Sequence, residues 1–524
     1  MGSSFSEKPG RRNVQTGVRL PARGLLLGVV LILLGLVCGA APTAEAARVM
    51  LPADSLQEIS AAVEAPVNSQ FRYNEVSGHG IIGPILRFYT RTGGPERHGK
   101  PLSEPVRVGN HYLQYFERSA LEFYPEYSGT GLEIRFAQLG QLAAEEAGVN
   151  LQPIAPFMGT AENWYFPENG HSLREPFLTY WRNEGDLNDL GLPISEELTR
   201  DGPDGTRITV QYFENTALQR PMDSTKVEEV SMVPLGTARA KQVLKPAQLA
   251  PISRERFSAP RTVKVPSLMF HYAREVDVKK DPLGYALSVK PANYIKFLDW
   301  VQENGYNTVT ISQIYDYLQY GILLPEKPVN FRWDDGHDNN WFVYQEMKKR
   351  GMTATFYIVT QRLELLPAQW KQIDQDGFEV AAHTRTHPDL RATKDLAGEV
   401  AGSKKDLEAI LGHPVRNFCY PYGYYNNTVK QMVRDSGFEI AVTTQGGYTW
   451  SADSKLEEPT ISVTGNDDLA SFAGKIKAGT AVQAVSNSSV SPTKAAAPPR
   501  STVPVKTTAA IQKTVPPISP TAKR

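Results

Sequence analysis

The pattern of hydrophobic and polar positions along the chain changes at about residue 265. Beyond that point, short apolar runs alternate with stretches whose apolar residues recur every three or four positions, a spacing that predicts amphipathic helices. In the stretch that begins at Pro291, for example, Tyr294, Phe297 and Val301 fall on one helical face. Strands that alternate with helices predict a parallel sheet, either open or closed into a barrel. The predicted strands are 267–271, 308–311, 328–333, 354–359, 378–382 and 417–420, and the predicted helices are 291–304, 312–320, 340–350, 367–376 and 396–411.

Residues from about 70 to 236 contain an internal repeat, with units at about 70–140 and 162–236. Four blocks match in the same order: 79–89 with 171–181, 99–104 with 191–196, 114–118 with 211–215, and 139–140 with 235–236. Each unit is predicted to combine a short helix, a Gly-x-Pro turn and a strand that carries Gln-Tyr-Phe-Glu, which makes a small α+β tandem domain. Its aromatic residues either fill two small cores or stack on sugar rings. The units loosely resemble the LGFP-like repeats of envelope-associated proteins.

The two ends of the chain differ in composition from the middle. Basic residues precede an apolar run at 25–41, and Ala44-Glu45-Ala46 is a small-residue cleavage pattern. We therefore expect residues 1–47 to be a signal peptide or a membrane anchor, and both interpretations place the rest of the chain outside the cytoplasm. Residues 237–264 are predicted to be a linker. Residues 475–524 are basic and rich in Ala, Pro, Ser and Thr, which predicts a disordered tail.

The composition excludes some classes of protein. The 524-residue length predicts two or three domains, and a formal net charge of zero without a basic domain argues against nucleic-acid binding. The two cysteines, Cys38 and Cys419, are too few for a Cys-rich zinc module or a disulfide framework.

Two short polar motifs follow predicted strands. Asp334 and Asp335 come directly after 328–333, and His383 and His387 follow 378–382. One carboxylate and two imidazoles are the three protein ligands of a catalytic divalent metal, and the spare carboxylate can act as a general base. Each motif alone also fits a surface turn or a structural histidine pair. Together, at the strand ends where barrel enzymes hold their chemistry, they predict metal-assisted hydrolysis.

Residues 265–474 resemble the polysaccharide deacetylases, the NodB-homology fold of carbohydrate esterase family 4. The family's Thr-Phe-Asp-Asp-Gly, His-Thr/Ser-x-x-His and Arg-Pro-Pro-Tyr-Gly motifs correspond to 332–336 (Arg-Trp-Asp-Asp-Gly), 383–387 (His-Thr-Arg-Thr-His) and 419–423 (Cys-Tyr-Pro-Tyr-Gly). The resemblance implies a distorted (β/α) barrel that removes N-acetyl groups from an envelope or extracellular polysaccharide of N-acetylhexosamine units. It also implies that Asp335, His383 and His387 bind a divalent metal, zinc in the first place, with cobalt or nickel as alternatives.

The same resemblance suggests three catalytic roles. Asp334 would deprotonate the attacking water, and the backbone N–H of Tyr422 would stabilise the oxyanion. Ordinary family members protonate the leaving amine with a histidine late in the chain, but no histidine follows Gly423 here. Permuted members place that histidine after an early Met-Tyr strand, which Met269-Phe270-His271 matches, so His271 is the candidate general acid. A buried structural role is the alternative for His271.

One departure from the family weakens this interpretation. Cys419 stands where the family has the arginine that orients the base, so Asp334 is expected to lack its usual partner. Arg332 is unusual in the first motif and would compensate if it reached Asp334, which the sequence does not show. The alternatives are therefore a catalytically impaired glycan-binding envelope protein, or a peptide or ester hydrolase that uses the same metal. The expected partners are a polysaccharide, the cell envelope through the repeats and the basic tail, and a membrane only if residues 1–47 are retained.

Overall fold

The computed structural model describes residues 71–202, 205–258 and 262–480. Its largest sheet is a closed barrel of parallel strands in the order β14-β24-β22-β21-β20-β19-β18, in which β18 pairs back with β14. A further short strand, β17 (Asn307–Thr308), pairs with β18. The predicted NodB-type (β/α) barrel is therefore confirmed. The barrel strands are β14 (Ser267–Phe270), β18 (Pro328–Trp333), β19 (Thr355–Ile358), β20 (Glu379–Ala382), β21 (Asn417–Cys419), β22 (Ile440–Gly446) and β24 (Glu458–Ser462).

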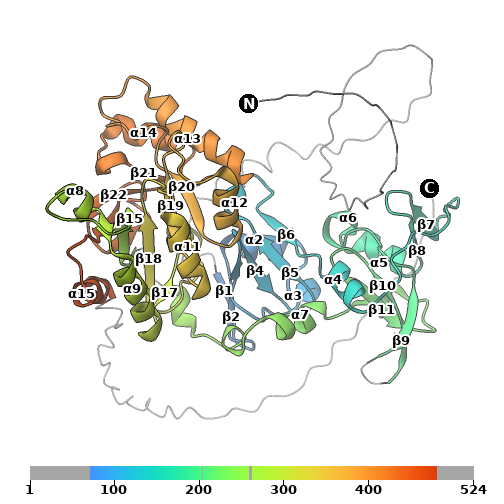
Figure 1. The fold of residues 1–524 in the computed structure, drawn as a ribbon. Helices are drawn as coiled ribbons and strands as arrows, with labels where there is room; N and C mark the ends of the chain where they lie inside the picture. The colour runs from blue at the N-terminus through green and yellow to red at the C-terminus, as the bar shows by residue number, and fades with distance from the viewer. Residues whose placement is uncertain (1–70, 203–204, 259–261, 481–524) are drawn as a thin grey trace, which may run out of the picture. The chain divides into compact units, whose positions relative to one another are not determined.

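Helices follow most of these strands and surround the barrel (Figure 1). Their ends coincide with capping residues: Thr310 begins α10 with a capping box, and Gly321 ends it in the left-handed conformation. Because Thr310 is a cap, the strand predicted at 308–311 is limited to Asn307–Thr308. The larger helices are α9 (Pro291–Glu303), α10 (Ile311–Tyr320), α11 (Asn340–Lys349), α12 (Pro367–Gln375), α13 (Leu396–Leu411), α14 (Asn427–Asp435) and α15 (Leu469–Thr480).

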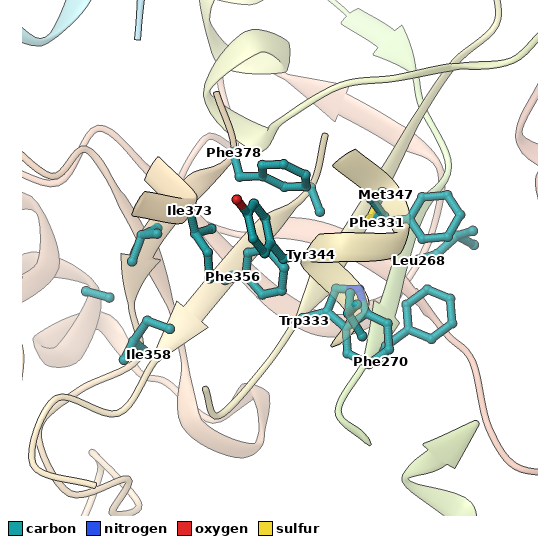
Figure 2. Close-up of a cluster of buried hydrophobic side chains, with 14 of the residues drawn as sticks. Leu268, Phe270, Phe331, Trp333, Tyr344, Met347, Phe356, Ile358, Ile373 and Phe378 are labelled. Atoms are coloured by element: carbon teal, nitrogen blue, oxygen red, sulfur yellow. The ribbon is translucent and has the colours of Figure 1, made fainter. Parts of the chain in front are cut away.

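Strand β18 presents two different faces. Phe331 and Trp333 are fully buried in the hydrophobic layer between barrel and helices, where Trp333 stacks on Phe270 at 4.8 Å between ring centroids (Figure 2). Successive side chains of a strand point to opposite faces, so Arg332 and Asp334 point into the barrel. The apolar face thus packs against the helices, and the polar face places Arg332 and Asp334 inside the barrel.

The residues before the barrel form two units with the same succession of elements. In each unit a hairpin precedes two short helices, a four-stranded antiparallel sheet and a last helix. Gln114 donates to the carbonyls of Gly80 and Ser103, and Gln211 donates in the same way to Ser172 and Ser195. The first unit is β1 (Phe71–Asn74), β2 (His79–Ile82), α2 (Gly83–Arg91), α3 (Gly94–His98), β3 (Val106–Val108), β4 (His111–Tyr115), β5 (Ala120–Phe123), β6 (Ile134–Phe136) and α4 (Leu139–Glu146). The second is β7 (Asn163–Phe166), β8 (His171–Arg174), α5 (Phe177–Asn183), α6 (Asp186–Asp189), β9 (Leu198–Asp201), β10 (Arg207–Tyr212), β11 (Ala217–Pro221), β12 (Ser231–Met232) and α7 (Leu235–Val243).

The last helix of each unit packs on the other unit. At the start of α4, Gln141 N donates to Glu214 O at 3.0 Å. At the start of α7, Thr237 N donates to Glu117 O, also at 3.0 Å. Gly140 and Gly236 allow this close approach, because a Cβ at either position would lie about 2 Å from a carbonyl oxygen of the opposite unit. The two units have therefore exchanged their terminal helices.

The aromatic pairs of the repeat divide between core and surface. Phe116 and Phe213 are fully buried, and Tyr89 and Trp181 are almost fully buried. Phe88 and Tyr180 are half-buried. The repeated histidines, His79 and His171, face Glu104 and Glu196 at 3.1 and 3.3 Å, which is a structural pairing. The core interpretation therefore fits most of these side chains.

The expected linker at 237–264 is wrong, because the segment is built into the fold. Helix α7 continues to Val243, and the buried ring of Phe257 stacks on Phe71 at 5.5 Å. Strand β13 (Thr262–Lys264) then pairs with β23 (Thr449–Ser451). Ala240, Phe257 and Val263 of this segment are buried, although it also contains three prolines and three lysines.

The boundary predicted at residue 475 is also wrong, because α15 continues to Thr480. Phe472 holds this helix to the barrel domain by stacking on Phe297 at 4.1 Å. The predicted leader 1–47 and the remaining tail, 481–524, lie outside the described residues. Within the described part of the chain, no helix combines the length and hydropathy needed to span a membrane.

Candidate active site

The predicted site residues lie at the carboxyl ends of the barrel strands. Asp334 and Asp335 follow β18, His383 follows β20, and His271 follows β14. The strands are parallel, so these ends form one rim of the barrel. Tyr422 stands on the turn after β21.

Backbone strain is concentrated at this rim. Six described residues other than glycine have a positive φ, and four of them belong to the site: Asp335 (77°), Thr384 (65°), His387 (64°) and Tyr422 (58°). Such conformations persist only where surrounding contacts impose them, as they do at functional sites. The loop of His387 is held in this way, because Glu399 accepts hydrogen bonds from the backbone N–H groups of Arg385 and Thr386.

Asp335, His383 and His387 converge on one point. Asp335 Oδ1 lies 3.4 Å from the Nε2 atoms of both histidines. In a tetrahedral zinc site with bonds of about 2.1 Å, ligand atoms are separated by about 3.4 Å. The three side chains are therefore spaced as ligands of one metal ion.

The hydrogen bonds around these ligands also fit a metal. His383 Nδ1 donates to the carbonyl of Cys419 at 2.8 Å, so its Nε2 points to the site as a metal-binding histidine requires. Asp335 Oδ1 is buried and has no hydrogen-bond partner. Burial alone would raise the pKa of Asp335, but His337 and His383, whose Nε2 atoms each lie 3.4 Å from one of its oxygens, lower it, so the carboxylate stays ionised. The residues fit a divalent cation.

A second group, Asp334, His383 and Cys419, also lies within reach of a common ion. Both oxygens of Asp334 are already engaged by Arg332, and burial raises the pKa of the Cys419 thiol. A neutral thiol is a poor metal ligand. The group with Asp335 is therefore the better metal site.

Arg332 reaches Asp334 inside the barrel. Its Nε and Nη2 atoms donate to Asp334 Oδ1 and Oδ2 at 2.9 and 2.7 Å, and Arg332 is fully buried. Burial would raise the pKa of Asp334, but the guanidinium outweighs burial and lowers it. Asp334 lacks the motif arginine, as expected, but Arg332 takes its place, which the sequence had left open. The sequence could not show this contact, because the motif does not indicate which way the arginine side chain points or which residue it bonds.

His337 joins the site from the turn after Asp335. Its Nε2 lies 3.4 Å from Asp335 Oδ2, and its Nδ1 donates to Glu364 Oε1 at 3.0 Å. The ring also stacks on Tyr272 at 3.7 Å. His337 therefore lies beside the carboxylate of Asp335, next to the group of candidate metal ligands.

His271 and Tyr422 differ in exposure. His271 is half-buried, desolvation lowers its pKa, and its electrostatic neighbours include Asp334 and Asp335. Tyr422 is 54% exposed, and its ring meets that of His387 edge to face at 4.6 Å. Neighbouring Tyr424 is 46% exposed, whereas Tyr420 is buried, so Tyr422 and Tyr424 are the tyrosines of this turn accessible to a substrate.

Comparison with known proteins relates this geometry to a family. Residues 323–441, which contain the Asp pair, the His pair and Cys419, match the family model of polysaccharide deacetylases. Over these residues the barrel domain is similar to the polysaccharide deacetylases. The domain is 27% identical over 194 residues to the deacetylase-like protein YxkH of Bacillus subtilis, covering 36% of this chain and 67% of that protein.

Other relatives show similar partial coverage. A peptidoglycan-N-acetylglucosamine deacetylase of Bacillus cereus is 25% identical over 141 residues, which are 26% of this chain and 63% of the relative. The deacetylase PplD of Streptococcus pyogenes, solved in complex with acetate, is 25% identical, and the match covers 41% of this chain and 98% of that structure with a TM-score of 0.38. The chain thus spans about two thirds of the length of its curated relatives.

Proposed function

We propose that this protein removes N-acetyl groups from an envelope or extracellular polysaccharide that contains N-acetylhexosamine. The observation that carries the proposal is the spacing of Asp335, His383 and His387 as three metal ligands, with the buried carboxylate of Asp334 adjacent. The similarity to polysaccharide deacetylases supports the reaction type. The Bacillus cereus relative named for peptidoglycan N-acetylglucosamine supports the substrate class.

The roles of the side chains follow from their positions. Asp335, His383 and His387 would hold a divalent cation, for which we propose zinc, with cobalt or nickel as alternatives. Such a cation supplies Lewis acidity for the acetamide carbonyl and lowers the pKa of a water molecule. Asp334, held ionised by Arg332, accepts the proton of the attacking water.

Two further groups would complete the reaction. The N–H of Tyr422, on a turn with a left-handed backbone, donates to the developing oxyanion. His271, at the same rim, donates a proton to the leaving amine. We also propose that the protein works outside the cytoplasm, where residues 1–47 would direct it and where the repeats contact the envelope.

Acetate release from N-acetylglucosamine oligomers with added zinc or cobalt tests the proposal. Replacing Asp334 with Asn should reduce kcat by about 10²–10⁴-fold, because general-base catalysis contributes that much, while metal binding persists. The control is Asp338→Asn, which changes an exposed carboxylate four residues further along and should leave activity unchanged. A wild-type protein that binds metal but releases no acetate would refute the deacetylase function. Full activity in His271→Ala would remove that residue from the mechanism.

A further inference from the structure

Arg332, on the inner face of β18, and Asp334, which follows this strand, form a buried ion pair. We propose that Arg332 is the residue that positions the catalytic base Asp334, in place of the arginine that the family carries at the position of Cys419. This inference rests on the proposed function, since it assigns a role within that reaction. Arg332 acts through Asp334 and is therefore a positioning residue.

The geometry restricts Asp334 to one orientation. Two parallel N–H donors engage its two oxygens at 2.9 and 2.7 Å, which fixes the plane of the carboxylate as well as its charge. Arg332 is itself anchored, because its Nη1 donates to the carbonyl of Thr443 on β22 at 2.9 Å. Asp334 N donates to Phe270 O on β14 at 2.9 Å. The carboxylate is thus held from its main chain and its side chain by three barrel strands, β14, β18 and β22.

Cys419 explains why the guanidinium fits. Its Sγ lies 3.2 Å from Arg332 Nη2 and 3.6 Å from Asp334 Oδ2, so position 419 borders the space that the guanidinium fills. All three residues are buried, and barrel interiors are close-packed. An arginine side chain at position 419 would therefore compete with that of Arg332 for the same place. A large residue on β18 and a small one on β21 replace the opposite arrangement of the family motifs.

The size of these residues makes an exchange experiment possible. The variants are Arg332→Thr, which restores the motif threonine, Cys419→Arg, which restores the motif arginine, and the double variant that combines them. Each is assayed for kcat and KM in acetate release from N-acetylglucosamine oligomers. Cobalt binding is measured by absorption and folding by circular dichroism, so that loss of metal or of structure is distinguished from loss of positioning.

We expect Arg332→Thr to lose about 10²-fold in kcat, with a change in KM below about threefold and with cobalt still bound. Cys419→Arg should also lose activity, because two guanidinium groups would compete for one carboxylate. The double variant should regain kcat to within about tenfold of the wild type. Arg332→Lys, which keeps the charge but cannot donate in parallel to both oxygens, should lie between the wild type and Arg332→Thr.

Several results would overturn the inference: full kcat in Arg332→Thr, a folded double variant no more active than Arg332→Thr, or a double variant that does not fold. If Arg332→Thr itself does not fold, the double variant alone decides. A wild type without activity on the oligomers refutes the proposed function instead, and the variants are then compared on p-nitrophenyl acetate. If Arg332→Thr and the wild type hydrolyse p-nitrophenyl acetate at equal rates, or if the wild type does not hydrolyse it, the positioning role is refuted as well.

Discussion

Two buried carboxylates of the barrel differ in their partners at the residue scale. Asp334 lies against a guanidinium, whereas Glu458 accepts a hydrogen bond from Ser451 N at 3.2 Å and its Oε2 has no partner. Burial raises the pKa of Glu458 to about 8, while Arg332 lowers that of Asp334. The barrel therefore keeps one carboxylate ionised and the other protonated at neutral pH.

Glu458 should make the barrel less stable as pH rises. Between its ordinary pKa of 4.5 and about 8, the folded chain binds one proton more than the unfolded chain, so the free energy of unfolding decreases with pH. The slope is at most about 1.4 kcal/mol per pH unit. Glu458→Gln removes this titration, so its stability relative to the wild type should increase between pH 5 and pH 8 in urea unfolding.

The control for this prediction is Glu457→Gln. Glu457 is the adjacent carboxylate, but it is partly exposed and faces Lys430 at 2.9 Å. Parallel stability curves for Glu458→Gln and the wild type across this pH range would contradict the prediction.

Some residues of the site can be identified from short sequence motifs, whereas one of its contacts depends on tertiary packing. Asp334, Asp335, His383 and His387 lie in two short motifs, so the sequence could identify them as one candidate metal site. The sequence offered Arg332 as a possible partner of Asp334 but could not establish the contact, since it depends on packing between Arg332 and Cys419, which are 87 residues apart. Tertiary packing carries that information, and the motif pattern does not.

At the scale of elements, the hydrophobic pattern predicted the bounds of several helices and strands well. Strand β18 and helix α13 begin and end where the sequence indicated, and α13 is bounded by Asp395 and Gly412. The segment 237–264 was wrongly predicted to be a linker, because composition does not show whether a few apolar residues pack against residues far away in the sequence. Phe257, for example, packs on Phe71.

The exchanged helices give a prediction about glycine. A Cβ at Gly140 would lie 1.9 Å from Phe213 O and 2.2 Å from Thr216 O, so Gly140→Ala should push α4 away from the second unit. Overpacking of this kind costs about 1–3 kcal/mol. Gly474→Ala, in helix α15 with no neighbour within 4 Å, should instead stabilise by about 0.5–1 kcal/mol. Urea unfolding distinguishes the two, and equal stability of Gly140→Ala and the wild type would contradict the close packing.

At the scale of the whole molecule, alternation of strands and helices predicted the fold class but not the closure of the sheet. An open sheet and a barrel share the same alternation, and the pairing of β14 with β18 decides between them. Those strands are separated by three helices and three short strands, so local periodicity does not reveal their contact.

The repeat module should fold only as a pair. A fragment of residues 71–152 contains α4 but lacks α7, which covers the turn at Glu117. We expect this fragment to show little cooperative unfolding, whereas residues 71–258 should unfold in one transition. Circular dichroism during thermal unfolding measures both, and a cooperative transition in the short fragment would show that the exchange is dispensable.

The exchange of helices also bears on the history of the chain. The last helix of each copy packs against the other copy, so a substitution in either helix has to remain compatible with a surface of the other copy. Loss of either copy would expose to solvent the surface of the other copy that its last helix covers. The two copies should accordingly differ in sequence more freely where they do not touch than around Gly140 and Gly236, where they are in contact.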